Sequence, residues 1–300
     1  MLDICLLGTG GMLPLPGRHL TAMLARCNGS MLLIDCGEGT QVTMRTLGWG
    51  FVGLDYILFT HVHADHIAGL PGLLLSLNNY GRRERLTIVG PKGIAVVVEK
   101  LRVIAPDLLY PIEIAEIPLQ NSPHSFRLGE YEVSALRLEH TIGCLGYSLR
   151  IPRAGKFDPD RARALNIPLK LWSKLQNGET IGGFTPDMVL GPERKGLKVS
   201  YITDSRPVGT IPDFIRNSDL FICEGLYGDD AMKQKAAAYG HMVFSDAAGL
   251  AKSGNVGELW LTHYSQSMPE PAYFLNAAKN IFKNSVAGTD RMTKTLMFED

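Results

Sequence analysis

The chain has 300 residues, with 30 Lys or Arg and 30 Asp or Glu, so its formal net charge at pH 7 is zero. A chain of this length with 45% hydrophobic residues can bury a large core without disulfides or a structural metal. The neutral balance argues against general affinity for nucleic acid, which normally comes from a basic excess. Any contact with nucleic acid would therefore depend on a local basic patch.

The cysteine pattern and the absence of long apolar runs predict a reduced, cytoplasmic protein. The five cysteines are odd in number and never spaced as C-x-x-C. No charged-then-apolar leader opens the chain, and no apolar run approaches the ~18 residues of a membrane span. We expect no membrane partner.

Short apolar runs recur along the chain, and runs of four to eight such residues bounded by turn signals predict buried strands. Helical patterns lie between them at 67–78, at least after Pro71, at 93–104, and at 245–253, where Ser245 can cap the helix. Strands alternating with helices indicate an α/β architecture. The runs, each with the polar residue that ends it, are 30–34 before Asp35, 56–59 before His61, 131–138 before Glu139 and His140, 198–202 before Asp204, 220–223 before Glu224 and 259–261 before His263.

The first run, 3–7, leads into Gly8-Thr-Gly-Gly11, which is not a dinucleotide-binding fingerprint. The third glycine of that fingerprint is absent, and Pro14 and Pro16 oppose the helix it requires. The motif instead predicts a turn close to a functional site.

The segment 152–196 interrupts the alternation of strands and helices. Prolines, glycines and charges dominate it, and only a short helix at about 158–165 is indicated. Residues 153–198 contain nine Lys or Arg against five Asp or Glu, so the segment is locally basic. Because long segments of this kind are usually functional or mobile, we expect an inserted arm that is a candidate substrate-binding exosite.

Four ionisable side chains, His61, His63, Asp65 and His66, directly follow the strand predicted at 56–59. His61 and His63 are two residues apart at a strand end, so their imidazoles leave the same face. Three imidazoles and a carboxylate converging from one turn suit zinc or a similar divalent metal. Four groups cannot fully serve two ions, so further ligands must come from other strand ends, and the candidates are His140, Asp204, Glu224 and His263.

On these residues the chain resembles the metallo-β-lactamase superfamily and, within it, the ribonuclease Z family of endonucleases that trim transfer RNA 3′ ends. The superfamily element is Thr60-His-Val-His-Ala-Asp-His66. The more specific likeness is Leu33-Ile-Asp-Cys-Gly-Glu-Gly-Thr-Gln41, together with His140 followed by Gly146-Tyr147. The resemblance implies an α/β metallo-β-lactamase fold over residues 1–300, a four-layer αββα sandwich. It also implies that the arm at 152–196 grips transfer RNA, usually from the partner subunit of a homodimer.

The resemblance further implies a role for each candidate residue. His61, His63 and His140 would bind one divalent ion, Asp65, His66 and His263 a second, and Asp204 would bridge the two. The ions would be zinc, or else manganese. Asp65 would also orient or deprotonate the attacking hydroxide, and His241 would protonate the departing 3′ oxygen while Glu224 holds its ring. The implied activity is a zinc-dependent phosphodiesterase or endoribonuclease that cleaves 3′ trailers from precursor transfer RNA.

Two departures from the family leave an alternative open. The arm contains Asn166-Ile-Pro-Leu-Lys-Leu-Trp172 and lacks the family's Gly-Pro pair, and Ser265-Gln-Ser-Met268 lacks the arginine of a Ser-x-Arg-Tyr end. The alternative is a hydrolase of the same fold that acts on a small phosphodiester, thioester or lactone without transfer RNA specificity. A binding module without catalysis is disfavoured because every metal ligand of the family pattern is present. A redox di-iron centre is disfavoured because no carboxylate replaces a histidine of the cluster.

Overall fold

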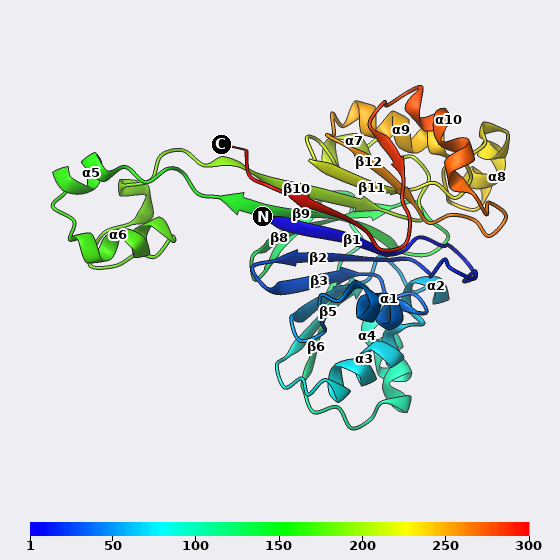
Figure 1. Cartoon of the computed structure of the whole chain (residues 1–300), viewed down its shortest axis with the longest axis horizontal. Coiled ribbons are helices and arrows are strands. Elements are labelled where there is room, and N and C mark those ends of the chain that lie inside the picture. The colour runs from blue at the N-terminus through cyan, green and yellow to red at the C-terminus, as the bar shows by residue number, and fades with distance from the viewer. Residues whose placement is uncertain (300) are drawn as a thin grey trace.

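The computed structural model describes residues 1–299 as two seven-stranded β-sheets with helices on their outer faces (Figure 1). In spatial order, the first sheet contains β14 (Met292–Leu296), β1 (Leu2–Gly8), β2 (Ala22–Cys27), β3 (Ser30–Ile34), β4 (Leu54–Leu58), β5 (Leu86–Pro91) and β6 (Ile112–Ile117). The second contains β13 (Ser285–Ala287), β12 (Leu259–Thr262), β11 (Leu220–Glu224), β10 (Arg194–Ile202), β9 (Cys144–Arg153), β8 (Tyr131–Leu138) and β7 (His124–Leu128).

Helices form the two outer layers. The first sheet is covered by α1 (Thr40–Leu47), α3 (Leu70–Asn79) and α4 (Ile94–Leu101), and the second by α7 (Ile211–Phe214), α9 (Phe244–Ser253) and α10 (Leu275–Lys279). Two further short helices, α2 (Ala64–Ile67) and α8 (Lys233–Ala238), contribute to the functional site described below. None of the helices in residues 1–299 combines the length and apolar character needed to cross a bilayer.

Three apolar cores hold the four layers together, and strand β1 shows how the sequence builds them. Its side chains alternate: Ile4 and Leu6 enter the core between the two sheets, and Cys5 and Leu7 enter the core under the helices. A strand buried on both faces therefore reads as one continuous apolar run. The expected four-layer αββα sandwich is confirmed.

Both sheets direct the ends of parallel strands toward a common edge. In the first sheet β3, β4, β5 and β6 run parallel, and in the second β10, β11, β12 and β13 do. Strand β8 has the direction of β10 because both are antiparallel to β9, which lies between them. The polar residues that were predicted to end these strands are therefore gathered at the carboxyl edge of the sheets.

The predicted elements agree with the observed ones in place and type, apart from one helix cap and the inserted segment, which contains a second helix. The helix predicted at 93–104 is α4 followed by a 3₁₀ turn (Arg102–Ile104), and the one at 67–78 begins at Leu70. The predicted capping role of Ser245 is wrong. Helix α9 already begins at Phe244, so Ser245 lies inside its first turn, and its hydroxyl donates to Asp230.

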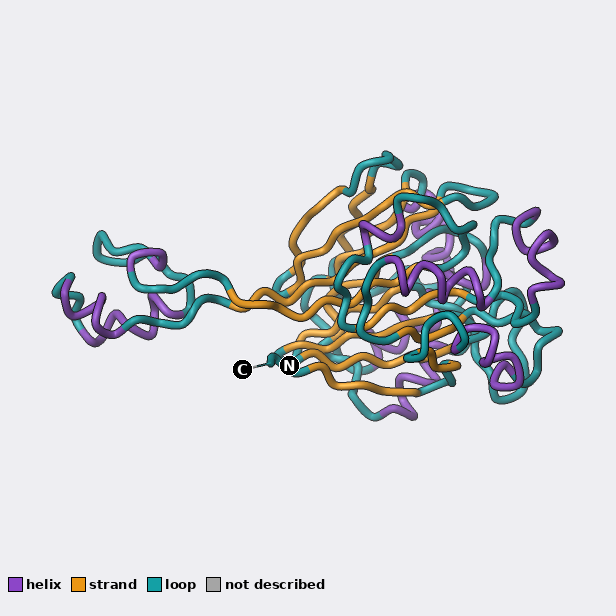
Figure 2. The backbone as a smooth tube through the Cα atoms, turned by 90° about the horizontal axis from the view of Figure 1, so that it is seen from above, coloured by secondary structure: helices purple, strands orange, loops and turns teal. Residues whose placement is uncertain are grey.

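The inserted segment projects away from the sheets as an arm on the extended ends of β9 and β10 (Figures 1 and 2). It contains α5 (Pro159–Ala164), close to the predicted helix, and α6 (Leu169–Gln176), which was not predicted. The arm has a small core of its own, formed by Ala162, Ile167, Leu175 and Val189. Trp172 packs against Phe157, with ring centroids 5.2 Å apart, and its indole N–H donates to the Ile167 carbonyl.

Candidate metal centre and active site

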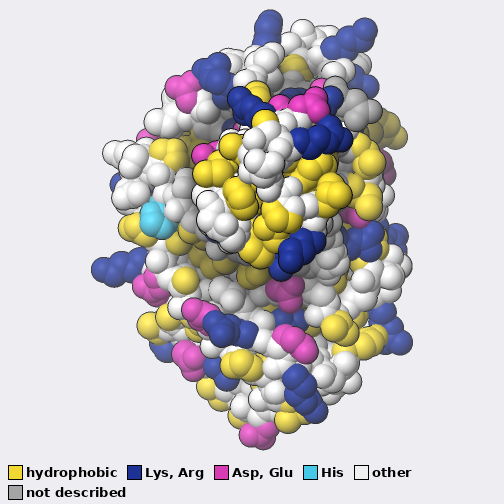
Figure 3. Space-filling model, turned by 90° about the vertical axis from the view of Figure 1, so that its left-hand side faces the viewer, with side chains coloured by type: hydrophobic (Ala, Val, Ile, Leu, Met, Phe, Trp, Pro, Cys, Tyr) yellow, Lys and Arg dark blue, Asp and Glu magenta, His cyan; other side chains and the backbone are white. Residues whose placement is uncertain are grey.

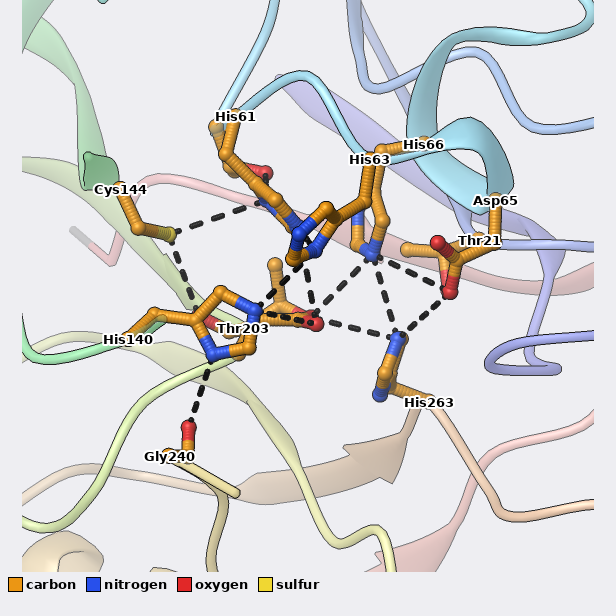
Figure 4. Close-up of polar contacts among 12 residues, drawn as sticks. Thr21, His61, His63, Asp65, His66, His140, Cys144, Thr203, Gly240 and His263 are labelled. Carbon is orange, nitrogen blue, oxygen red and sulfur yellow. Dashed lines mark hydrogen bonds and ion pairs between the residues drawn. The ribbon is translucent and has the colours of Figure 1, made fainter. Parts of the chain in front are cut away.

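Three of the site residues have a left-handed backbone at the end of a strand. The φ angles are 60° at Asp35 after β3, 46° at Asp204 after β10 and 58° at His263 after β12. This region is uncommon for residues other than glycine, and such conformations cluster at functional sites. The sharp change of chain direction leaves these side chains at the common edge of the sheets, where Asp35 contacts His66 and Asp204 approaches His263. Figure 4 shows His263 there, facing Asp65 and His66.

One group of donor atoms comes from His61, His63, His140 and Asp204. The His61 Nε2 and His63 Nδ1 atoms are 3.0 Å apart, and the His140 Nε2 atom is 3.2 Å from His63 Nδ1. The Asp204 Oδ2 atom lies 3.6 Å from His61 Nε2 and 3.7 Å from His140 Nε2. Three ring nitrogens and one carboxylate oxygen therefore surround a single point.

A second group comes from Asp65, His66 and His263, again with Asp204. The Nε2 atoms of His66 and His263 are 3.2 Å apart, and Asp65 Oδ2 lies 3.7 Å from the first and 3.4 Å from the second. The Asp204 Oδ1 atom is 3.2 Å from both of these nitrogens. Asp204 thus presents one oxygen to each group.

Both groups have the dimensions of a metal-ligand set. Donors bound at about 2.0–2.1 Å to a tetrahedral zinc ion lie about 3.3–3.4 Å from one another. The observed separations of 3.0–3.7 Å bracket that value. Imidazole nitrogens with carboxylate oxygens are also the donors that zinc and similar divalent metals select. The residues present therefore fit divalent cations.

Groups behind the donors hold the rings in orientation, as is usual for metal ligands. The His66 Nδ1 atom lies 2.8 Å from Asp35 Oδ2, and Asp35 also accepts a hydrogen bond from the Thr60 backbone N–H. The His140 Nδ1–H donates to the Gly240 carbonyl at 3.1 Å. The sequence reasoning assigned no role to Asp35, although its position directly after a buried strand was an available signal.

The pKa shifts of the buried groups indicate that positive charge would stabilise the centre. Burial alone would raise the pKa of Asp204, but the imidazoles of His263 and His66 outweigh it and hold that pKa well below its usual value. Burial would lower the pKa of His66, but the carboxylates of Asp204 and Asp35 raise it well above normal. Burial and the neighbouring His66 lower the pKa of His61, which keeps that ring neutral, as a metal ligand must be.

His241 and Glu224 form a separate pair beside the donor groups. Glu224 is fully buried at the end of β11, and its Oε2 atom lies 3.1 Å from His241 Nδ1. The His241 ring centroid is 5.0 Å from that of His140 and 5.7 Å from that of His263. Burial would lower the pKa of His241, but the Glu224 carboxylate raises it to about 9. Glu224, a candidate ligand on its position alone, lies behind His241 rather than in either donor group.

The Gly8–Met12 turn supports the second donor group, a contact that the sequence analysis anticipated only as a turn near the site. The Met12 backbone N–H donates to Asp65 Oδ2 at 2.7 Å. Gly11 packs so tightly against the His263 ring that a Cβ atom there would lie 2.7 Å from the ring's Cε1 atom. The carboxylate of Asp290, in the C-terminal segment, accepts hydrogen bonds from the backbone N–H groups of Thr9 and His19 and so ties both sides of this turn. Sequence reasoning missed Asp290, because no local pattern marks it.

All nine predicted site residues lie in one region, and six of them line a hollow of about 520 Å³. Six of the chain's eight histidines are among the nine. Of the nine, His61, His66 and Glu224 lie behind the side chains that line the hollow. The lining also includes Tyr227, Lys235 and Tyr239. The site therefore joins side chains that could hold divalent cations, a carboxylate-held imidazole and an open hollow.

Comparisons with known proteins agree with this geometry. The family profile described as "Anti-Pycsar protein Apyc1" matches residues 2–164. This range includes five of the seven donor residues, up to His140, but neither Glu224 nor His241. "Ribonuclease Z" of Lachnospira eligens is 53% identical over 100% of this chain and 99% of its own length. "Ribonuclease Z" of Clostridium kluyveri is 52% identical over the full length of both chains.

Solved structures show the same fold. The human tRNase Z short form (ELAC1) superposes with a TM-score of 0.73 at 24% identity, covering 99% of this chain and 100% of that one. The metallo-β-lactamase fold protein YhfI from Bacillus subtilis gives a TM-score of 0.70 at 20% identity, with 98% of each chain covered.

The solved structures show the metallo-β-lactamase fold, and together with the ribonuclease Z relatives and the donor groups they define a metal-dependent hydrolase. Within that class, identity above 50% over the whole chain shows that the protein belongs to the ribonuclease Z family.

The close packing of Gly11 against His263 makes Gly11→Ala a test of the second donor group. The added methyl group would displace the His263 ring, so we expect the affinity for zinc to fall by about 10- to 100-fold, as when the outer support of a ligand is lost. Calorimetric titration of the metal-free variant measures this. Gly209→Ala is the control, because no atom lies within 4 Å of a Cβ built there. Equal zinc affinity in the two variants would contradict the assignment of His263 as a ligand.

Proposed function

We propose that this protein is an endoribonuclease that removes 3′ trailers from precursor transfer RNA with the help of two divalent ions, zinc or else manganese. The observation that carries the proposal is full-length identity above 50% to ribonuclease Z proteins, combined with a His241–Glu224 pair beside two donor groups. The alternative, a hydrolase of small substrates without transfer RNA specificity, has no comparable support.

Two ions are proposed because the seven residues described above as donors form two groups, with one oxygen of Asp204 directed to each. His241 also lies within reach of Asp204 and His263, but it is assigned another role because Glu224 holds its Nδ1 atom. Divalent cations bound there would supply charge that stabilises the phosphoryl group in transit and would acidify water at neutral pH. The other steps can be assigned to side chains of the chain itself.

Asp65 is placed to accept the proton of the attacking water. Burial would raise its pKa, but the hydrogen bond and charge of His263, with the charge of His66, lower it below its usual value, so the carboxylate is ionised at neutral pH. The Met12 N–H fixes the orientation of Oδ2. A positioned base of this kind typically contributes 10²- to 10⁴-fold to the rate.

His241 is placed to protonate the leaving group. With a pKa raised to about 9, the ring carries a proton on Nε2 at neutral pH, while Nδ1–H donates to Glu224. As the water oxygen bonds to phosphorus, the bond from phosphorus to the 3′ oxygen breaks, and that oxygen takes the Nε2 proton. The products are a transfer RNA body with a 3′ hydroxyl and a trailer with a 5′ phosphate.

The arm is proposed as the second contact with the substrate, acting from the partner subunit of a homodimer. Its local basic excess suits phosphate contacts. Figure 3 looks at the end of the molecule that carries the arm and shows apolar side chains bordered by Lys and Arg. Leu165, Leu169 and Met188 are exposed arm residues that contribute apolar surface.

We also place the protein in the cytoplasm, since all five cysteines are free and buried.

Single-turnover cleavage of a 3′-extended precursor transfer RNA by the zinc-loaded protein tests the function. We expect one cut at the end of the acceptor stem that leaves a 3′ hydroxyl on the body. Hydrolysis of bis(p-nitrophenyl) phosphate without any cut at that position would reject the transfer RNA specificity and leave only a metal-dependent phosphodiesterase.

Replacement of His241 tests the proton donor. His241→Ala should lower the rate on precursor transfer RNA by about 10²- to 10⁴-fold. The loss on bis(p-nitrophenyl) phosphate should be much smaller, because p-nitrophenolate leaves without a proton. His124→Ala, in β7 and outside the site, is the control. If His241→Ala slowed both substrates equally, the ring would serve the site in some way other than protonating the leaving oxygen.

Removal of the arm tests its role. Gly155 and Gly191 lie side by side, because a Cβ on Gly155 would be 2.0 Å from the Gly191 carbonyl oxygen, so a short Gly-Ser linker can replace residues 156–190. We expect the variant to retain its turnover of the chromogenic diester and to bind precursor transfer RNA weakly, with a smaller salt dependence. The double variant Lys170→Gln/Lys174→Gln keeps the arm and removes two exposed charges. It should weaken the binding of precursor transfer RNA and lower its salt slope by up to about two, with turnover of the chromogenic diester unchanged. Equal loss on both substrates would mean that the arm is structural.

A further inference from the structure

Two tyrosines and a lysine line the catalytic hollow without any part in the chemistry described above. Tyr227, Lys235 and Tyr239 all face it, together with Asp65, His241 and His263. Tyr239 is 60% exposed, although it is only two residues from the buried His241. An exposed aromatic ring at the mouth of a charged hollow has lost little water and is free to receive a flat ligand.

Lys235 places a positive charge beside these two tyrosines. Its ammonium nitrogen lies 5.4 Å from the centre of the Tyr227 ring, and within residues 1–299 it forms no ion pair with a carboxylate. It is also the one Lys or Arg side chain that lines the hollow in the described part of the chain. The carboxylates of Asp65 and Asp204 are directed to the cation ligands, so Lys235 remains available for an anionic group of a substrate.

Hydrogen bonds hold the segments that carry Tyr227, Lys235 and Tyr239 in a fixed position relative to the catalytic residues. Gly240 follows Tyr239, and its carbonyl accepts the Nδ1–H of His140 at 3.1 Å. The backbone N–H of His241 donates to Ala236 in helix α8, the helix that carries Lys235. On the other side, the Tyr227 carbonyl accepts the N–H of Phe244, and the preceding Leu226 carbonyl accepts that of Ser265. A ligand on these side chains would therefore be held at a fixed place relative to His241.

We propose that Tyr227, Lys235 and Tyr239 form a nucleotide platform, on which an unpaired nucleotide next to the scissile bond binds with its base stacked on an aromatic ring and its phosphate at Lys235. The inference rests on the proposed function, since it names how the same site holds its substrate. Stacking accepts any base, because every base has a π-face, so the platform fixes the position of the cut rather than the identity of the base.

The nucleotide on the platform is the one that loses the trailer. His241 protonates the oxygen that leaves, and in this reaction that is the 3′ oxygen of the upstream nucleotide. Because Tyr239 and Lys235 are joined to His241 through α8 and Gly240, the upstream nucleotide is the one nearest to them. Stacking its base would hold its 3′ oxygen next to His241 in the bound substrate and in the transition state alike, so the stack contributes to KM rather than to kcat.

The test uses the zinc-loaded, full-length protein and a precursor transfer RNA that carries 2-aminopurine immediately upstream of the cut. Stacking on a ring quenches this base, so binding should quench its fluorescence in the wild type and in Tyr239→Phe, but not in Tyr239→Ala. Tyr239→Ala should raise KM for the precursor by about 5- to 150-fold and leave kcat within about twofold, the cost of one lost stack. Lys235→Met should reduce the slope of log KM against log salt by about one, and Lys235→Arg should restore it.

Tyr80→Ala is the matched control, since Tyr80 is exposed to a similar extent (54%) but stacks on Phe51 in the first half of the chain. Wild-type KM and full quenching in Tyr239→Ala would overturn the platform while leaving the proposed function intact. A fall in kcat and in melting temperature with unchanged KM would also overturn it, by showing a structural role. Failure of the wild type itself to cut the precursor would instead reject the proposed function.

Discussion

The buried carboxylate of Asp204 is the group on which the rest of the site depends. It is 2% exposed, and each of its oxygens faces imidazole nitrogens of a different donor group. A carboxylate removed from water in this way is costly unless positive charge compensates it. The neighbouring imidazoles do so in part, as the opposite pKa shifts of Asp204 and His66 show. Two divalent cations, one at each oxygen, would compensate it fully, and this is the physical basis of the proposed two-metal site.

The αββα fold makes that arrangement possible, because it brings strand ends from both halves of the chain to one edge. The turn after β4 supplies the His61–His66 cluster, while β8, β10, β11 and β12 of the other sheet supply His140, Asp204, Glu224 and His263. The large apolar core between the sheets fixes the distance between the two contributions. At the rim, Asp290 near the C-terminus holds the Gly8–Met12 turn against Asp65 and His263. A site assembled from such distant segments is held by the packing of the whole domain rather than by any one loop.

Much of the site was predictable because strand ends leave a clear local signal. An apolar run that stops at His61, Asp204 or His263 shows where a side chain must lie at the edge of a sheet, and spacing alone placed His61 and His63 together. The proposed roles of His241 at the leaving group and of Glu224 behind its ring came from family resemblance. The structure places Glu224 Oε2 3.1 Å from His241 Nδ1, which is the contact that these roles require. Asp290 and the packing of Gly11 on His263 could not be predicted, because each contact joins segments more than 200 residues apart. Helix α6 was missed because glycines and prolines dominate the segment around it, although its apolar side chains recur at helical spacing.

The account requires the two donor groups around Asp204 to hold one cation each. Anomalous diffraction at the zinc absorption edge, from crystals of the full-length protein grown with excess zinc, measures this directly. The account predicts two peaks, one among His61, His63 and His140 and one among Asp65, His66 and His263, with Asp204 between them. A single peak, or none among these side chains, would contradict it.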